Sequence, residues 1–411
     1  MAHIVFVTSA QPAANPRMIK EVTALQEAAY NVTVIWSPIA PWADEFDQLI
    51  FNQNPAIEWI QAGYHHKHQK IQYFFARARQ KYWQIINRLF GNVFDASIKS
   101  QVLFSQELIK KATGIKADLY IGHNLGALPA IVKAAKLHNA KSIFDFEDFH
   151  RGEHRPGSLQ NKAVIDVEDK YIPHVHGITA SSSMIAQAYE KIYTDKKIIT
   201  INNVFPLSFA VKEVIDIPVK PLKLFWFSQY IGKKRGLEMI LQAMSKFKKN
   251  EISLTLLGTV SNEMRDYFQN YLSVLQLSTE QLIFLDPVVE STIPEIASHY
   301  HIGICSEVAH IENRDLCLTN KLFMYLLSGN ALLLSNTKAQ QSFLNEYPDI
   351  GMSFEQESAE SISKAFQFYI DYPDVLNQHR FNAVQLAKTK LNWDTESVKW
   401  LSFINDTNYE K

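Results

Sequence analysis

The stretch CLTNKLFMYLLSGNALLLS, residues 317–335, contains a complete helix-to-strand unit of the kind that decides this fold. A Thr-Asn pair precedes an apolar run with helical spacing, a Ser-Gly pair follows the run, and the stretch ends in a wholly apolar strand. Asn320 is expected to cap the helix and Gly329 to end it. A buried helix that leads straight into a buried strand is typical of a parallel sheet covered on both faces.

The same alternation of apolar strands and amphipathic helices runs along most of the chain. Strands are predicted at His3–Ser9, Asn31–Ser37, Asp118–His123, Lys141–Asp148, His176–Ser182, Lys197–Asn203, Lys223–Ser228, Ser253–Gly258, Leu282–Pro287, Ile302–Glu307 and Ala331–Asn336. Helices are predicted after Asn15, which would cap the first one, and later at Ser358–Tyr369, Val375–Thr389 and Trp393–Ile404. The predicted fold class is therefore α/β, with Rossmann-like, doubly wound parallel sheets.

The length of the chain and one proline-rich segment predict two domains. A chain of 411 residues is too long for one ordinary core. The segment 204–223 holds three prolines and has no helical period, so it is expected to link the domains. The predicted domains are 1–205 and 222–390, and the final segment, about 391–411, is expected to pack back on the first. In such an architecture the expected site is the cleft that the strand ends face.

Composition excludes several classes of function. The formal net charge of −1 argues against a nucleic-acid partner. The two cysteines, Cys305 and Cys317, lack metal-site spacing and favour a reducing cytoplasm. The N-terminus reads as a first strand and not as a signal peptide, and no apolar run is long enough to span a membrane.

Cations gather where two strands of the second half lead into helices. Lys233, Lys234 and Arg235 follow the strand that ends at Ser228, and Lys321 lies in the first turn of the helix in the opening stretch. A helix N-terminus disfavours cations unless an anion shares the site, so two such helix starts predict a diphosphate. The alternative is a solvated basic turn and a snorkelling lysine. No Walker or GxGxxG pattern occurs.

Taken together, the order of these motifs resembles the GT-B glycosyltransferases of the family-4-like, retaining, nucleotide-sugar-dependent group. The stretches that carry the resemblance are DLYIGHNLGALPAIVKAAK (118–136), FDFED (144–148), ITASSSMIAQAYEKIY (178–193), FSQYIGKKRGLEMILQAMS (227–245) and NKLFMYLLSGNALLLS (320–335). The resemblance covers nearly the whole chain. It implies two Rossmann-like domains facing across a cleft, the first on the acceptor side and the second binding the donor.

The resemblance also implies roles for individual residues. The expected donor-binding residues are Ser228, Lys233, Lys234, Arg235, Thr319, Asn320, Lys321 and Met324. His123 and Glu147 are the expected catalytic residues, and Asn15 and Arg17 the expected acceptor-binding residues. The implied reaction moves a sugar from a nucleotide diphosphate sugar to a saccharide or lipid-linked acceptor, in cell-surface polysaccharide or glycoconjugate synthesis. The group needs no divalent metal and no cofactor beyond the nucleotide sugar.

Three positions depart from the pattern of this group. Met324 and Leu316 stand where a pair of glutamates is usual, and Gln229 stands where an arginine is expected. A thioether cannot accept a hydrogen bond from ribose as a carboxylate does, so Glu312, Asp315 or another group would have to substitute. Two alternatives therefore stay open: a non-catalytic, glycosyltransferase-like partner subunit, and a nucleotide-sugar epimerase on the same fold.

An acidic and histidine-rich cluster raises the question of a metal. Asp145, Glu147, Asp148, His150 and His154 lie close together in the sequence, but neighbouring residues of a strand point to opposite faces. We therefore expect Glu147 or Asp148 to line the cleft and expect no metal there.

The segment from Tyr64 to Phe94 is basic and aromatic. It contains six Lys or Arg residues and three His residues but no acid, with apolar side chains interleaved. Such a segment suits the surface of an anionic membrane, which would make the protein a peripheral one at the cytoplasmic face. The alternative is a long surface helix that packs its aromatic residues on the first domain.

Overall fold

The computed structural model describes residues 2–409. The chain forms two compact units, of which unit 1 comprises Met1–Ile201 with Ser397–Lys411 and unit 2 comprises Asn202–Glu396. Met1 and residues 410–411, at the ends of the predicted first domain and terminal segment, lie outside the described residues. The chain thus leaves unit 1 just before the proline-rich segment and returns to it within the last helix, α17 (Trp393–Tyr409).

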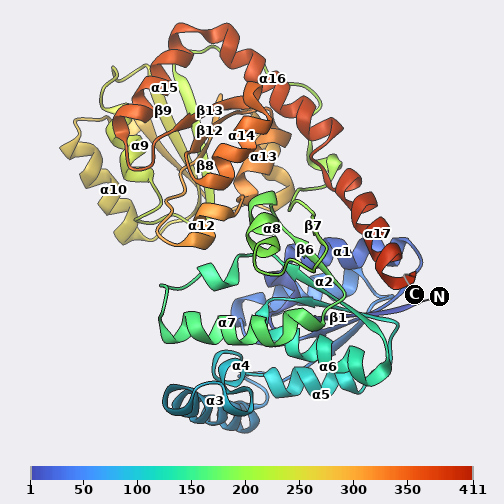
Figure 1. The fold of residues 1–411 in the computed structure, drawn as a ribbon. Helices are drawn as coiled ribbons and strands as arrows, with labels where there is room; N and C mark the ends of the chain where they lie inside the picture. Colours follow the sequence, from blue (N-terminus) through green and yellow to red (C-terminus); the bar gives the residue numbers. More distant parts are fainter. Residues whose placement is uncertain (1, 410–411) are drawn as a thin grey trace. The chain divides into compact units, whose positions relative to one another are not determined.

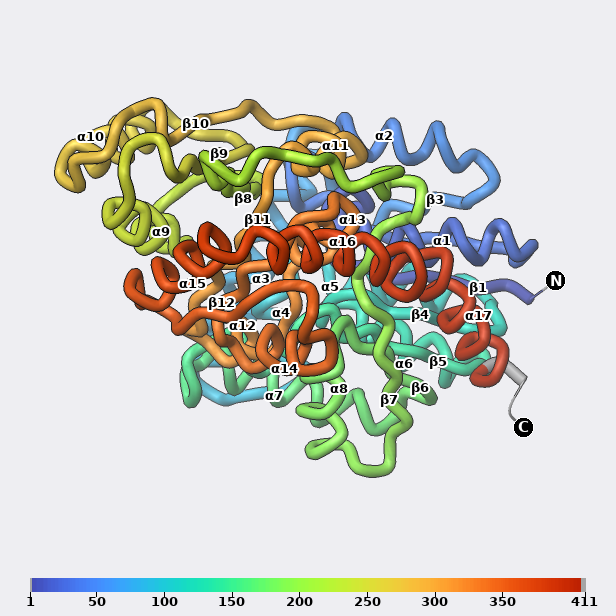
Figure 2. Tube along the Cα trace, turned by 90° about the horizontal axis from the view of Figure 1, so that it is seen from above, coloured from blue at the N-terminus to red at the C-terminus, as the bar shows by residue number. Residues whose placement is uncertain are grey.

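Unit 1 is built on a parallel sheet (Figure 1). Its strands are β1 (His3–Thr8), β2 (Asn31–Trp36), β3 (Glu58–Gln61), β4 (Leu119–His123), β5 (Lys141–Phe146), β6 (Gly177–Ala180) and β7 (Ile198–Thr200). Their order in the sheet is β3-β2-β1-β4-β5-β6-β7, and every pairing is parallel. The succession of β4, β5, β6 and β7 can be followed along the trace in Figure 2. Because all strands run the same way, their carboxyl ends meet at one edge.

The helices of unit 1 connect and cover these strands. They are α1 (Pro16–Glu27), α2 (Asp44–Gln53), α3 (Lys70–Phe90), α4 (Ala96–Gln101), α5 (Ser105–Thr113), α6 (Leu128–His138), α7 (Leu159–Tyr171) and α8 (Ser183–Glu190). Helix α6 packs on β4 and β5, whereas α3 contacts α4 beyond the layer of helices that covers the sheet (Figure 1). As predicted, Asn15 caps α1: its side chain accepts the backbone N–H of Met18, and Pro16 opens the helix.

Unit 2 repeats the architecture with a second parallel sheet. Its strands are β8 (Leu222–Tyr230), β9 (Ile252–Thr259), β10 (Leu282–Leu285), β11 (Ile302–Cys305), β12 (Ala331–Ser335) and β13 (Gly351–Phe354), in the order β10-β9-β8-β11-β12-β13. Its helices are α9 (Leu237–Met244), α10 (Asn262–Val274), α11 (Ile293–Ser298), α12 (Glu312–Leu316), α13 (Asn320–Ser328), α14 (Lys338–Glu346), α15 (Ala359–Asp371) and α16 (Pro373–Thr389).

The core of unit 2 shows why its strands are apolar on both faces. Along β12, Leu333 belongs to one buried cluster, while its neighbours Leu332 and Leu334 belong to another. Strand β8 alternates in the same way, with Trp226 in the first cluster and Phe225 in the second. Side chains alternate across a strand, so helices must cover both faces of the sheet. The predicted α/β class is confirmed.

The structure corrects one local prediction, the cap of α13. Asn320 is the first residue of α13 and not its cap; Thr319 holds the cap position without a side-chain capping bond. The Asn320 side chain instead accepts a hydrogen bond from Asn203 Nδ2 at 3.0 Å. Gly329 does end α13, with a left-handed φ of 68° that glycine adopts without strain. Among the described residues, no helix combines the length and apolar character that crossing a membrane requires.

Candidate functional site

In unit 2, a tight turn brings the end of β8 against the end of β11. Gly236, between the turn and α9, has φ = 78°, and a Cβ there would lie 2.6 Å from the carbonyl oxygen of Ser306. Only glycine fits such an approach. The Ser306 hydroxyl donates to the carbonyl of Arg235 at 2.6 Å, which fixes the basic turn beside the residues that leave β11.

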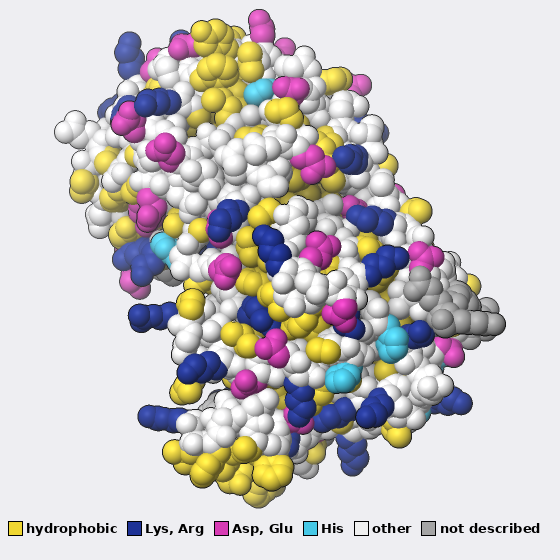
Figure 3. Space-filling view, viewed as in Figure 1, with side chains coloured by type: hydrophobic (Ala, Val, Ile, Leu, Met, Phe, Trp, Pro, Cys, Tyr) yellow, Lys and Arg dark blue, Asp and Glu magenta, His cyan; other side chains and the backbone are white. Residues whose placement is uncertain are grey.

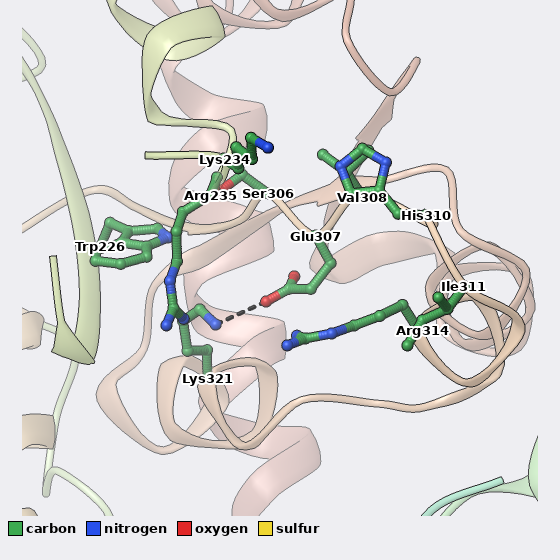
Figure 4. Close-up of a pocket in the computed structure, with 10 residues that line it drawn as sticks. All are labelled: Trp226, Lys234, Arg235, Ser306, Glu307, Val308, His310, Ile311, Arg314 and Lys321. Carbon is green, nitrogen blue, oxygen red and sulfur yellow. Dashed lines mark hydrogen bonds and ion pairs between the residues drawn. The ribbon is translucent and has the colours of Figure 1, made fainter. Parts of the chain in front are cut away.

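A cavity of about 320 Å³ opens where these two strand ends meet (Figure 4). Its lining residues are Trp226, Lys234, Arg235, Ser306, Glu307, Val308, His310, Ile311, Arg314 and Lys321. In Figure 4, the Arg235 side chain runs past Trp226 toward Lys321, and Arg314 reaches toward Glu307 from the opposite wall. Four cationic side chains therefore face one cavity that holds a single carboxylate.

Glu307 is the partner of Lys321. The Lys321 Nζ lies 2.6 Å from Glu307 Oε1, and Gln340 donates to Glu307 Oε2 at 2.8 Å. Burial alone would raise the pKa of Glu307, but the Lys321 ammonium and the two hydrogen bonds hold it below its usual range. Lys321 also lies 5.7 Å from the centre of the Trp226 ring. The negative partner that the sequence required for Lys321 is thus supplied within the chain.

The remaining cations of the cavity have no such partner. Arg235 donates from Nη1 to the Ser228 hydroxyl at 3.2 Å, a neutral acceptor. Within the described part of the chain, Lys234, Arg235 and Arg314 take part in no ion pair. A cavity wall with this excess of positive charge favours an anion, and guanidinium groups match phosphate oxygens in geometry.

A second cavity, of about 510 Å³, shares Arg235 and Lys321 with the first. Apolar side chains line much of it, among them Phe205, Phe227, Leu257, Val288 and Ile293. Its polar residues are Ser228, Gln229, Tyr230, Glu290, Asn320, Arg235 and Lys321. A partly apolar pocket beside a cationic one suits a flat organic group attached to an anionic group.

The structure brings most of the predicted donor-binding residues to the two cavities, but not all of them. Ser228, Lys234, Arg235, Asn320 and Lys321 line the two cavities. Lys233 is turned away, with its Nζ 4.1 Å from the centre of the Tyr267 ring.

Met324 is fully buried in the apolar core of unit 2, so the expectation that it faces a cleft is wrong for this structure. Its side chain lies among the apolar residues that α13 packs on the sheet. Thr319 is the cap residue of α13.

Sequence reasoning missed four residues that line these cavities. Arg314 and Glu307 carry charge, Trp226 supplies a ring, and Glu290 offers a carboxylate in the second cavity. Glu307 could have been found, because it lies at the predicted exit of β11 as Ser228 does at that of β8. Arg314 lies in the short helix α12, whose sequence has no apolar periodicity from which the helix could be predicted.

In unit 1, the strand ends hold a buried polar network. Arg17 and Glu21 come from α1, His123 from the end of β4, and Asp145 from β5, directly opposite His123 in the register. Arg17 binds Asp145 through Nε at 2.9 Å and through Nη2 at 2.8 Å, and His123 Nε2 lies 3.0 Å from Glu21 Oε2. All four side chains are at most 1% exposed.

The charges of this network balance one another. Burial alone would lower the pKa of His123, but the charge of Glu21, the carboxylates of Glu147 and Glu21 that accept from the imidazole, and the charge of Asp145 raise it to about 10. Burial would raise the pKa of Asp145, yet Arg17 and His123 hold it below its usual range. Burial raises the pKa of Glu21 above its usual range, although His123 and Arg17 act in the opposite direction. Arg17 and His123 thus face Asp145 and Glu21 inside the fold.

The ligand atoms of Glu21, His123 and Asp145 converge within 4.8 Å of one another, a spacing that a metal ion could use. Glu21 was not in the cluster that the sequence suggested. The Arg17 guanidinium already binds both oxygens of Asp145, so positive charge is supplied where an ion would place it. The donor set therefore fits a structural network better than a metal site.

Glu147 is the accessible carboxylate beside this network. Its side chain is 21% exposed, and Asn124 donates to its Oε2 at 3.2 Å. The His123 Nδ1 lies 3.8 Å from Glu147 Oε1, on the inner side. His123 itself has no exposed surface. The structure thus brings the two predicted catalytic residues together, with Glu147 toward solvent and His123 behind it.

The two predicted acceptor-binding residues have structural partners. Asn15 caps α1 and is 2% exposed. Arg17 is 1% exposed. Its Nη1 donates to the carbonyl oxygen of Ile201 at 2.7 Å, in addition to the two hydrogen bonds that the guanidinium donates to Asp145. These contacts give each residue a role in holding unit 1 together, and their binding of an acceptor stays a prediction.

No protein-family model matches the chain, and no curated protein matches its sequence. Solved structures do match. HepE from Anabaena in complex with UDP is similar with a TM-score of 0.71 at 11% identity, over 99% of this chain and 100% of HepE. A glycosyltransferase from Rickettsia africae ESF-5 has a TM-score of 0.68 at 14% identity, over 100% of this chain and 99% of its own. Sucrose-phosphate synthase from Thermosynechococcus elongatus has a TM-score of 0.69 at 11% identity, over 99% of both chains. The predicted GT-B fold is confirmed.

Proposed function

We propose that this chain is a glycosyltransferase that moves a sugar from a nucleotide diphosphate sugar to a saccharide or lipid-linked acceptor, in cell-surface polysaccharide or glycoconjugate synthesis. The observation that carries the proposal is the cavity at the ends of β8 and β11, where Lys234, Arg235, Arg314 and Lys321 face one carboxylate. The fold is also that of HepE, which has been solved with UDP and with UDP-glucose.

The shared wall of the two cavities suggests how a donor would lie. Arg235 and Lys321 line both cavities, which supports a position of the diphosphate beside these two residues. The base and ribose would occupy the larger, more apolar cavity. Because Met324 is buried, the carboxylate for the ribose hydroxyls would come from Glu290, which lines that cavity and is exposed.

The chemistry follows from charge. When the bond between the anomeric carbon and the phosphate oxygen breaks, the diphosphate gains negative charge and the sugar becomes oxocarbenium-like. Fixed cations beside the phosphates stabilise that transition state more than the ground state. Arg235, Lys234, Arg314 and Lys321 would supply this charge without a divalent metal, and no cofactor besides the co-substrate is needed. We place the enzyme in the retaining class.

Unit 1 would supply the acceptor side. Glu147 is the residue assigned to the reacting groups, because it is partly exposed and accepts a hydrogen bond from Asn124. His123 is fully buried, so it acts as a positioning residue for Glu147. Asn15 and Arg17 would shape the acceptor region through the fold of α1. The free cysteines Cys305 and Cys317 suit a cytoplasmic location.

Calorimetric titration with UDP, UMP, uridine and UDP-glucose, together with GDP and ADP, tests the proposal. We expect binding to weaken from diphosphate to monophosphate to nucleoside, because the cavity cations contact phosphate. If no nucleoside diphosphate binds, the proposal is wrong.

A second candidate, a non-catalytic partner subunit, is favoured by one observation: α13 carries a buried methionine where the resembled enzymes carry a carboxylate. Turnover separates the candidates. An active transferase releases UDP from a bound UDP-sugar when acceptor or water is present, an epimerase converts the sugar without releasing UDP, and a partner subunit does neither.

A further inference from the structure

Helix α3 carries an apolar stripe that no part of the described chain covers. Ile71, Phe75, Tyr82, Ile85 and Leu89 recur at spacings of three, four or seven residues and are 71, 65, 56, 58 and 66% exposed. Such spacing places them on one face of the helix. Most isolated surface apolar residues need no explanation, but a continuous stripe of this size marks an interaction surface.

The opposite face of α3 attaches the helix to unit 1. Ala76 is 2% exposed, and Gln80 donates from Nε2 to the carbonyls of Ser100 and Gln101 at 3.2 and 3.1 Å. Arg79 binds both oxygens of Glu107, at 2.8 and 2.7 Å. The alternative that α3 packs its aromatic residues on the first domain is therefore wrong for most of them. Tyr73 does contact the Phe104 ring, but Phe74, Phe75, Tyr82 and Phe90 are exposed.

The apolar surface continues beyond the end of the helix. Phe90 is 65% exposed, and Phe94, in the turn that follows, is 82% exposed. Hydrophobic side chains gather at the lower end of the space-filling view, where Figure 1 places α3 (Figure 3). We call the surface formed by Ile71, Phe74, Phe75, Tyr82, Ile85, Leu89, Phe90 and Phe94 the α3 face.

Four cations follow one edge of the α3 face. Lys70, Arg77, Lys81 and Arg88 follow one another at spacings of seven, four and seven residues. Such spacings place all four on one side of the stripe. All four are exposed, and none forms an ion pair with another described residue. The segment from residue 64 to residue 94 contains no Asp or Glu. Arg79 differs from these four, because Glu107 already neutralises it.

We propose that the α3 face docks on an anionic lipid bilayer, with the helix lying in the plane of the interface. The apolar stripe would enter the boundary between headgroups and acyl chains, and Lys70, Arg77, Lys81 and Arg88 would contact anionic headgroups. The inference does not rest on the proposed sugar transfer, because it uses residues far in the sequence from the cationic cavity of unit 2.

Charge decides between a membrane and a second copy of this chain as the occupant. Two copies that met through α3 would bring eight uncompensated cations to one interface, with no carboxylate on either helix to pair with them. A bilayer that contains anionic lipid offers the opposite charge along the whole edge. The α3 face therefore fits a lipid surface and not itself.

Vesicle flotation of the full chain tests this proposal. We expect the protein to float with vesicles of phosphatidylcholine and phosphatidylglycerol, to float weakly with phosphatidylcholine alone, and to be released as salt rises. The double variant Arg77→Gln, Lys81→Gln should partition about tenfold less or lower, as should Phe75→Ser, Ile85→Ser. The matched control is Lys248→Gln, Lys249→Gln, two exposed lysines of unit 2.

Circular dichroism and melting temperature check that each variant is folded, which we expect because Phe75, Arg77, Lys81 and Ile85 are all exposed. Equal flotation of wild type, both α3 variants and the control would overturn the proposal. So would a dimer, detected by light scattering, that Phe75→Ser, Ile85→Ser converts to a monomer, because the α3 face would then be an interface between copies.

Discussion

Two groups of charged residues at strand ends, one in each unit, differ in how their charges are compensated. In unit 1, Arg17 and His123 face Glu21 and Asp145 within a buried network. In unit 2, Lys234, Arg235, Arg314 and Lys321 face Glu307 alone, around an open cavity. Both groups arise from the same sequence pattern, polar residues that follow apolar strands.

The comparison teaches that position at a strand end is not enough to identify a binding site. The network of unit 1 pairs its charged groups with one another inside the fold. The cavity of unit 2 keeps a surplus of positive charge, which only a ligand or solvent can balance. Counting charges within contact distance therefore separates a structural network from a candidate site. The predictions below test this distinction.

Removing Arg17 should produce the largest effect. Arg17→Ala leaves Asp145 buried without its bidentate partner, and loss of one member of a buried ion pair costs about 3–5 kcal/mol. Chemical denaturation followed by circular dichroism measures the change. The control Arg235→Ala should change the free energy of unfolding by less than about 0.5 kcal/mol, since Arg235 is partly exposed and has no ionic partner. Similar losses for both variants would erase the difference between the two groups.

Met324→Glu should be next in size. The position is fully buried in an apolar cluster, so a carboxyl placed there loses hydration without gaining a partner, at a cost of about 2–3 kcal/mol. The control Met324→Leu keeps the volume and apolar character and should cost less than about 1.5 kcal/mol. Melting temperatures with and without UDP separate the outcomes. A Met324→Glu variant that is as stable as wild type and binds UDP more tightly would show that the side chain reaches the nucleotide.

Arg235→Ala should weaken UDP binding by about 1.5–3 kcal/mol, the range for a hydrogen bond to a charged group. Lys233→Ala is the matched control, because Lys233 lies two residues earlier but packs on Tyr267. Titration calorimetry with UDP and uridine should show the loss for the diphosphate only. If the Lys233 variant loses as much affinity as the Arg235 variant, the phosphates lie outside the cavity assigned to them.

Much of the fold could be predicted from the sequence, because buried parallel strands are continuous apolar runs. The strands that prediction missed, β3 (EWIQ) and β13 (GMSF), lie at sheet edges, where one side lacks a neighbour and the apolar run is short. The predicted strand at Lys197–Asn203 shrinks to Ile198–Thr200 for the same reason, since β7 is the other edge of its sheet.

The candidate site was less predictable, because the role of each charged residue depends on ion pairs with residues that are distant in the sequence. Lys321 was expected to need an anion, and the structure supplies Glu307 from a different strand end, at 2.6 Å. Arg17 was assigned to an acceptor, yet Asp145, 128 residues away, holds it inside unit 1. The local sequence shows that a charged residue lies at a strand end. Only the tertiary structure shows whether a residue of opposite charge already pairs with it.

The pH dependence of stability tests whether the network of unit 1 holds a proton. The pKa of His123 is raised from 6.5 to about 10, so the folded chain keeps a proton that the unfolded chain releases above about pH 6.5. The stabilisation is complete below pH 6.5, falls as pH rises toward 10, and is absent above it, with a slope of at most about 1.4 kcal/mol per pH unit. His123→Gln keeps a hydrogen-bonding side chain but cannot titrate. We therefore expect the free energy of unfolding of wild type to fall more steeply than that of His123→Gln between pH 7 and 9, measured by denaturation at each pH. Parallel curves would mean that His123 is neutral in the folded chain, and the balance of two cations against two carboxylates would no longer describe unit 1.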